Sequence, residues 1–237
     1  MGYIKMKQFN LNRRYWLSLP ILLLAGLGLS GCNQGERSYQ VNLTNLTHNQ
    51  PMSPLAVILH NQDFRAWSTG MPASDGIERL AEGGDSSMLL EVEAGSTANT
   101  TTAMGSGLIL PGNTDSVTIT GKIRGSISLS IASMLVNTND GFTGASAVDV
   151  SSLRFDEPLT LFVHAWDAGT EANDELAANL PGPAGGGEGF NINRNDQNFI
   201  TAHPGVITSD DGSMMSALDS SHRFDNPVAR LVVTRIH

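Results

Sequence analysis

Hydrophobic and polar residues alternate with a period of two along much of the chain after residue 38. The stretch YQVNLTNL, residues 39–46, sets apolar residues at every second position, and residues 116–136 repeat the pattern. This period is typical of strands with one buried face. Segments of this kind, or short apolar runs between turn residues, predict strands at residues 39–46, 54–60, 108–110, 116–123, 126–136, 159–166 and 228–236. So many strands with little helix predict an all-β fold, an antiparallel β-sandwich.

One short helix interrupts the strands. In SDGIERLAE, residues 74–82, apolar residues recur at helical spacing after a capping Ser74, and two glycines follow. Residues 87–93 either extend this helix or begin a strand. The Ser/Thr/Asn-rich residues 96–102 predict a loop, and the Pro/Gly-rich residues 181–189 predict a flexible one.

The first 31 residues have a different pattern. Basic residues precede an apolar run, Tyr15 to Leu29, which is shorter than the about 20 residues that span a bilayer. This pattern predicts a signal peptide over residues 1–31. The run ends in Leu29-Ser30-Gly31-Cys32, which resembles the lipobox of bacterial lipoproteins, so we expect Cys32 to be lipidated. The alternative is an ordinary signal peptide or signal anchor with a chance cysteine.

Cys32 is the only cysteine, so an internal disulfide is excluded. The lipobox resemblance implies a membrane anchor at Cys32. The short polar stretch after it predicts a tether over residues 32–38, and the lack of a second boundary predicts one domain over residues 39–237. Asn33, in place of an aspartate, resembles the signal for the outer membrane of a Gram-negative bacterium. Whether the domain faces the periplasm or the surface stays open.

Charge narrows the class of partner. The chain has a net charge of −9, and residues 33–237 carry ten basic and 23 acidic residues, a net charge of −13. A nucleic acid partner is disfavoured, because it needs a basic surface. An exported acidic domain is consistent with cation binding, calcium in particular, or with solubility alone.

Four stretches in order resemble the spondin N-terminal domain family. They are residues 39–54 (YQVNLTNLTHNQPMSP), 73–84 (ASDGIERLAEGG), 133–144 (SMLVNTNDGFTG) and 166–171 (WDAGTE). The resemblance implies a sandwich similar to the calcium-dependent membrane-binding sandwiches, with a divalent cation held by loops at one end. It also implies an extracellular binding or adhesion module with a protein or glycan ligand.

Four acidic residues are the candidate metal ligands: Asp140, Asp167, Asp149 and Glu171. Asp140 and Asp167 each follow an apolar strand, and calcium takes six to eight oxygen ligands from such loops. The alternative is that these residues only make turns, since Asn-Asp-Gly and Asp-Ala-Gly are good turns without metal. Family members often carry Val-Asp near Ala145-Ser146, where Ser146 is a poorer ligand.

An enzyme is not expected from this sequence. The six histidines are scattered, with no His-x-x-x-His pair and no Gly-x-Ser-x-Gly elbow. A secreted or periplasmic hydrolase and a purely structural envelope protein remain the alternatives to a binding module.

Overall fold

The computed structural model describes residues 1–3, 35–96 and 99–237 of the 237-residue chain. Every strand and helix below lies in one compact unit, Gln34–His237. The predicted signal peptide and the predicted lipidation of Cys32 lie outside the described residues. Within those residues, no helix has the length and apolar character needed to span a membrane.

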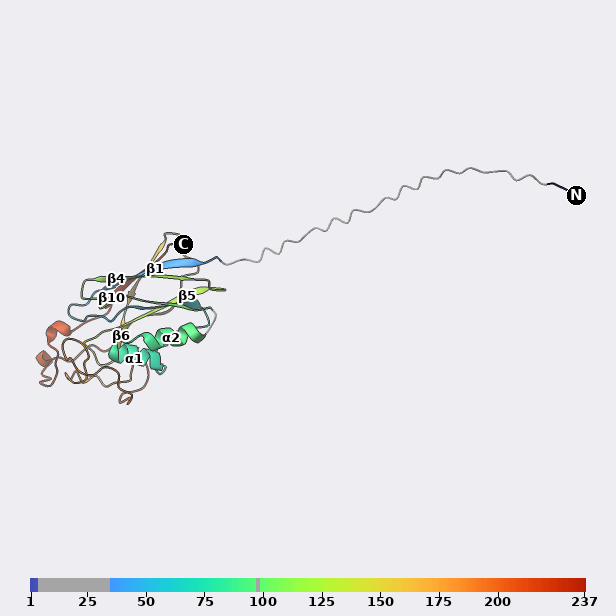
Figure 1. Ribbon diagram of the computed structural model, residues 1–237. Coiled ribbons are helices and arrows are strands. Elements are labelled where there is room, and N and C mark those ends of the chain that lie inside the picture. Colours follow the sequence, from blue (N-terminus) through green and yellow to red (C-terminus); the bar gives the residue numbers. More distant parts are fainter. Residues whose placement is uncertain (4–34, 97–98) are drawn as a thin grey trace. The chain divides into compact units, whose positions relative to one another are not determined.

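Two antiparallel sheets form the domain (Figure 1). The four-stranded sheet has the order β4 (Thr114–Gly121), β1 (Arg37–Asn45), β10 (Ala229–Arg235) and β7 (Pro158–Val163). The six-stranded sheet has the order β3 (Thr101–Met104), β2 (Ala56–Asn61), β5 (Ile127–Met134), β6 (Gly141–Asp149), β8 (Ala165–Asp167) and β9 (Thr201–Ala202). Every pairing between these strands is antiparallel, which confirms the predicted all-β sandwich.

The main core lies between the two sheets. Tyr39, Val41 and Leu43 alternate along β1, and all three are fully buried. They pack in one cluster with Leu231 on β10 and Leu129 on β5 of the other sheet. Burial of each large apolar side chain contributes about 1.5–3 kcal/mol, so the alternation in the sequence is what holds the sheets together.

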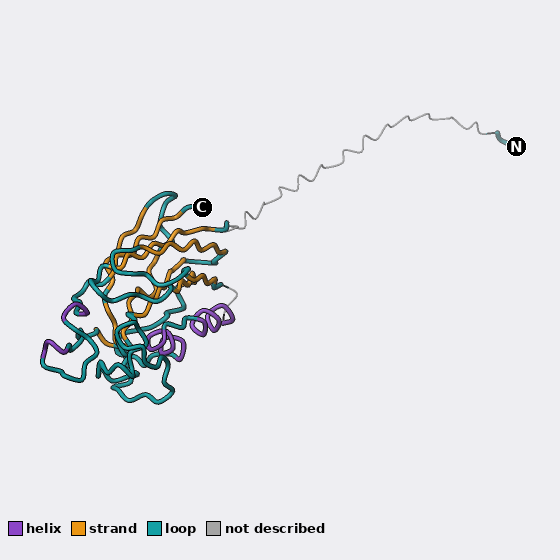
Figure 2. The backbone as a smooth tube through the Cα atoms, turned by 60° about the vertical axis from the view of Figure 1, so that its left-hand side comes forward, coloured by secondary structure: helices purple, strands orange, loops and turns teal. Residues whose placement is uncertain are grey.

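A second core lies on the outer face of the six-stranded sheet. Helix α1 (Asp75–Gly83) buries Ile77 and Leu80 against Ile58 and Phe142, and helix α2 (Ser87–Ser96) follows it on the same side of the strands (Figure 2). Strand β5 is therefore buried along its whole length. The helices thus cover one face of the sheet that contains β6 and β8.

Helix α1 has the ends that its sequence predicts. The Ser74 hydroxyl accepts a hydrogen bond from the backbone N–H of Ile77 at 3.3 Å, and Gly84 ends the helix with φ of 69°. Glycine is favoured at this position because it adopts the left-handed backbone conformation without steric cost. The adjoining residues 87–93, which fitted either a helix or a strand, belong to helix α2.

Some sequence predictions are corrected by the structure. The single strand predicted at 159–166 is two strands, β7 and β8, which belong to different sheets and are separated by His164. Residues 108–110 form no strand. Ile109 makes a single isolated β-bridge, to Met52. The predicted loop at 96–102 contains the end of α2 and the start of β3.

Strand β6 was not predicted, and its position matters most for the site. Its sequence, GFTGASAVD, has small residues and two glycines in place of a clear alternation. It nevertheless pairs with β5 on one side and β8 on the other. The segment between β8 and β10 is mostly irregular, and its regular elements are β9 and two short 3-10 helices, η1 (Ser209–Asp211) and η2 (Ser220–His222). Figure 2 shows these loops gathered at one end of the strands.

Candidate functional site

Asp140 and Asp167 lie side by side at this end of the six-stranded sheet. Asp140 directly precedes β6, and Asp167 ends β8, where it is the register partner of Gly141. The backbone N–H of Ala168 also donates to the backbone carbonyl of Asp140 at 3.2 Å. The missed strand β6 is therefore what brings together two acids that are 27 positions apart in the sequence.

Asp140 is fully buried and uses only one of its two carboxylate oxygens. Its Oδ2 accepts hydrogen bonds from the backbone N–H groups of Thr170 and Glu171, at 2.7 and 3.1 Å, and a weaker one from the Thr170 hydroxyl at 3.3 Å. Its Oδ1 is buried and has no hydrogen-bond partner. A buried acceptor without a hydrogen bond lowers the stability of the fold unless another group or an ion binds it.

The Asp167 side chain is held by the loop that follows β8. Its Oδ1 accepts from the backbone N–H of Gly169 at 2.8 Å, and its Oδ2 accepts from the Asn173 amide at 2.6 Å. Gly169 has φ of 69°, and a Cβ there would lie 2.4 Å from the carbonyl oxygen of Phe199. The glycine of the Asp-Ala-Gly-Thr stretch is thus required for the turn that positions both acids.

Glu171 extends the cluster toward helix α1. It is 5% exposed, and its Oε2 is buried without a hydrogen-bond partner. Its acidic neighbours include Glu82 in the last turn of α1. Within the described residues, none of Asp140, Asp167, Glu171 and Glu82 has an ion-pair partner, because the nearby Arg194 is bonded to Glu78.

Burial raises the pKa of each of these carboxyls, and repulsion within the cluster raises those of Asp140 and Glu171 further. Burial, and then the charge of Asp167, raises the pKa of Asp140 to about 7. Burial, followed by the charges of Glu82 and Asp140, raises the pKa of Glu171 to about 8. Burial also raises the pKa values of Asp167 and Glu82. A cation bound here would offset both the lost solvation of the buried carboxylates and the repulsion between them.

Asp149 does not join this cluster. It lies at the far end of β6, roughly 25 Å along the strand from Gly141 at about 3.3 Å per residue. Its Oδ1 accepts from the backbone N–H and the hydroxyl of Ser151, and these bonds lower its pKa. The structure thus brings together three of the four sequence candidates, Asp140, Asp167 and Glu171.

Residues 40–178 match the family model described as Spondin_N, which covers more than half of the chain. The chain belongs to the spondin N-terminal domain family. A search of curated proteins finds no match. The match ends before β10, although that strand lies in the middle of the four-stranded sheet of this spondin domain.

Sequence reasoning missed several residues around the acids of the spondin domain. Glu82 was assigned only to the helix, and nothing in the sequence links it to Asp140. Thr170 belongs to the family-like stretch and could have been found there, as could Asn173, two residues after Glu171. Within the described residues, no three or more His, Cys, Asp or Glu side chains are arranged to hold a metal ion as they stand. Calcium, however, also takes backbone and amide oxygens and waters.

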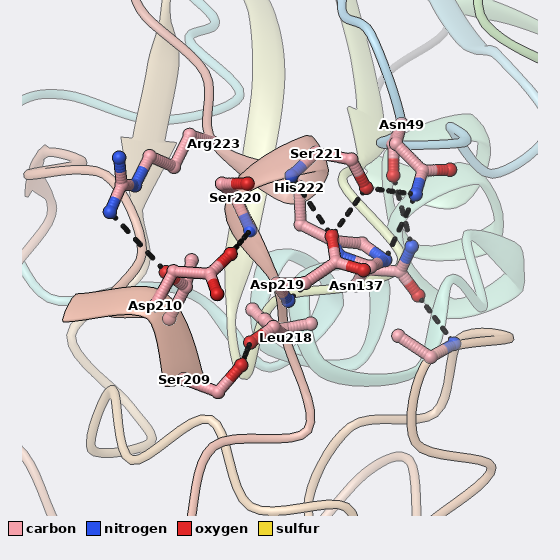
Figure 3. A network of polar contacts seen from close by, with 12 residues as sticks. Asn49, Asn137, Ser209, Asp210, Leu218, Asp219, Ser220, Ser221, His222 and Arg223 are labelled. Carbon is pink, nitrogen blue, oxygen red and sulfur yellow. Dashed lines mark hydrogen bonds and ion pairs between the residues drawn. The ribbon is translucent and has the colours of Figure 1, made fainter. Parts of the chain in front are cut away.

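The three residue types of a serine hydrolase meet elsewhere in the spondin domain, in the network of Figure 3. Asp219 lies 3.0 Å from the Nδ1 of His222. The Ser221 hydroxyl, however, bonds to Asp219, and the Nε2 of His222 faces the amide of Asn49 at 3.1 Å. This trio therefore lacks the contact by which a histidine would take the serine proton.

The same network instead joins three loops. Gln50 donates from its Nε2 to the carbonyl of His222 at 3.0 Å, and its Oε1 accepts from the backbone N–H of Asn137 at 3.2 Å. The Oδ1 of Asn137 in turn accepts from the backbone N–H of Ala184 at 3.0 Å. The asparagine of the NTNDG stretch thus fixes the Pro/Gly-rich loop beside the acidic site (Figure 3).

The raised pKa values of Asp140 and Glu171 predict that the metal-free domain loses stability as pH rises. Both folded-state values exceed the value of about 4 in an unfolded chain, so the folded state binds more protons and unfolding becomes easier at higher pH. Buried His203 and His60 have lowered pKa values and act in the opposite sense only below about pH 6.5. With a chelator present to keep the domain metal-free, we therefore expect its melting temperature to fall by several degrees between about pH 6.5 and 8.5. A flat profile over this interval would contradict the raised pKa values of Asp140 and Glu171.

Proposed function

We propose that this chain is a cell-envelope lipoprotein whose spondin domain binds calcium and acts as an extracellular binding or adhesion module. The observation that carries the metal proposal is the pair of buried, unpartnered carboxylate oxygens, Oδ1 of Asp140 and Oε2 of Glu171. Both belong to a cluster of acids without an ion-pair partner in the described part of the chain. The lipid anchor on Cys32 and the outer-membrane location rest on the sequence motifs.

The donor set suits calcium better than other common ions. Asp140, Asp167 and Glu171 supply only oxygen atoms. Calcium accepts six to eight such ligands in flexible geometry, whereas magnesium needs a near-octahedral set and zinc favours nitrogen and sulfur. Bound calcium would supply the positive charge that three close carboxylates require, and so would hold the loop after β8 against the loop before β6.

Calcium titration with the melting temperature as readout tests this proposal. Calcium at 100 times its dissociation constant should add about 2.7 kcal/mol to the free energy of unfolding. For a domain of this size that is a rise in melting temperature of about 5–10 °C. Magnesium at the same concentration should produce a much smaller rise, and excess chelator should reverse the effect of calcium.

Two matched substitutions locate the effect. Asp140→Asn should abolish the calcium response, and it should stabilise the metal-free protein at high pH because it removes one of the repelling charges. Asp149→Asn makes the same chemical change at the opposite end of β6 and should leave the response intact. The proposal is wrong if calcium does not move the melting temperature of the unsubstituted protein, or if Asp149→Asn and Asp140→Asn behave alike.

A further inference from the structure

We infer that a pocket formed by Trp67, Trp166 and Arg65 binds an acidic sugar residue, one that carries a carboxylate or a sulfate. The inference rests on the proposed binding function and names its ligand class. The pocket has a volume of about 300 Å³ and lies on the outer face of the six-stranded sheet, where β6 and β8 meet the segment that follows β2. This volume is at the lower limit for ligand sites, about 300–1,000 Å³, and suits a single ring.

Both tryptophans of the described chain line this one pocket. The chain has three tryptophans, and the third, Trp16, lies outside the described residues. Trp166 is the register partner of Phe142 on β6, and the Trp67 ring meets Phe142 edge-on with 5.2 Å between centroids. An indole offers an apolar surface beside polar groups, as the C–H face of a sugar ring requires.

The Trp67 wall is held in place before any ligand arrives. Gly144 lies beneath it, and a Cβ on Gly144 would be 3.0 Å from the Trp67 ring and 2.0 Å from the carbonyl oxygen of Ile131. The backbone N–H of Trp67 also donates to the Ser146 hydroxyl at 3.3 Å. Trp67 is only 8% exposed and packs in the second core, so the small part of it that reaches the pocket is held in place, while the partly buried Trp166 offers more of its ring. A preformed wall lowers the entropy cost of binding.

Charge selects an anionic ligand. Arg65 is the only charged residue that lines the pocket, although the chain as a whole has a net charge of −9. It is exposed and has no ion pair or hydrogen bond within the described residues. A guanidinium binds carboxylate and sulfate oxygens in a two-pronged fashion. Exposed Ser68 and Thr69 beside it offer hydroxyl groups for the rim of a sugar ring.

Tryptophan fluorescence measures this binding directly. The mature protein of the proposed lipoprotein, which begins at Cys32 and so lacks Trp16, reports only on Trp67 and Trp166, and it would be titrated with glucuronate, glucose 6-sulfate and glucose. We expect a saturable change with one or both acidic sugars, and binding of glucose at least about tenfold weaker, because a charge-assisted contact is missing. Which acidic sugar binds more tightly identifies the carboxylate or the sulfate as the preferred group.

Variants separate the pocket from the rest of the molecule. Arg65→Gln should raise the dissociation constant for the acidic sugar about tenfold without a change in melting temperature. Arg230→Gln, at an exposed position on the other sheet, should have no effect. The inference is overturned if no sugar gives a saturable change, if glucose binds as tightly as glucuronate, or if Arg65→Gln binds as tightly as the parent. Asp140→Asn should lose the calcium response but retain the sugar response, so the metal proposal and the pocket fail independently.

Discussion

Cys32→Ala should move the protein out of the membrane fraction almost completely. An acyl chain contributes about 0.8 kcal/mol for each buried methylene, and stable anchoring takes more than one chain, as on a lipidated N-terminal cysteine. Without the thiol, no acyl group can be attached. In detergent phase separation the parent protein should enter the detergent phase, and the variant should either stay in the aqueous phase or retain its signal peptide. Mass spectrometry should show the loss of the lipid or the added peptide.

The neighbouring residues provide controls for the anchor. Gln34→Ala should partition like the parent, because it leaves the Leu29-Ser30-Gly31-Cys32 sequence intact. Asn33→Asp should stay lipidated but fractionate with the inner membrane, if the chain follows the rule of enteric bacteria. Unchanged partitioning together with unchanged mass in Cys32→Ala would refute lipidation and leave the sandwich assignment untouched.

The sequence was sufficient to predict the sandwich because strands such as β1 bury one face in the core and turn the other toward solvent. Tyr39, Val41 and Leu43 alternate with polar residues, and the structure buries those three. Strand β6 has no such signal, because it is covered on the outer face as well, and small residues and glycines let Trp67 approach it closely. A strand that packs against other residues on both faces need not alternate apolar and polar residues, so periodicity alone does not reveal it.

The split of residues 159–166 has a similar cause. A continuous apolar run fits one strand, and only tertiary contacts show that it changes sheets. On one side of His164, Val163 pairs with Ala229 of β10, and on the other side Ala165 pairs with Thr143 of β6. The Asn226 side chain accepts a hydrogen bond from the Ala165 backbone at 2.7 Å and so satisfies a donor at the crossing.

The candidate site was predicted in part for the same reason. Asp140 and Asp167 could be found because each follows an apolar run, and Glu171 because it lies in the same family-like stretch. Asp149 was included because it follows Asp140 by only nine residues, and the strand between them carries it to the other end of the sheet. Glu82 was missed because its approach depends on how helix α1 docks on the six-stranded sheet, which no local pattern encodes.

An ion pair between Arg194 and the buried Glu78 adds to the apolar contacts that dock helix α1. Arg194, in the irregular segment, donates to both carboxylate oxygens of Glu78, at 2.8 and 2.7 Å, and to the carbonyl of Ala73 at 3.0 Å. The Glu78 side chain is only 6% exposed. Removal of one partner from a buried pair leaves the other as an unpaired buried charge, which costs about 3–5 kcal/mol. Burial raises the pKa of the neighbouring Glu82, and the charge of Arg194 slightly limits that rise, so the arginine also acts on the acidic site.

Arg194→Met should therefore lower the melting temperature by about 10 °C, given about 2–4 °C for each kcal/mol in a domain of this size. Glu78→Gln combined with Arg194→Met should recover much of that loss, because the double variant no longer buries a charge. Arg230→Met, which removes an exposed arginine from β10, should change the free energy of unfolding by less than about 0.5 kcal/mol. If the double variant is as unstable as Arg194→Met alone, the loss comes from the packing of the arginine stem and its bond to Ala73, and the ion pair is not what holds α1 in place. The expected recovery would instead assign the loss in Arg194→Met to the unpaired charge of the Glu78 side chain, which is only 6% exposed.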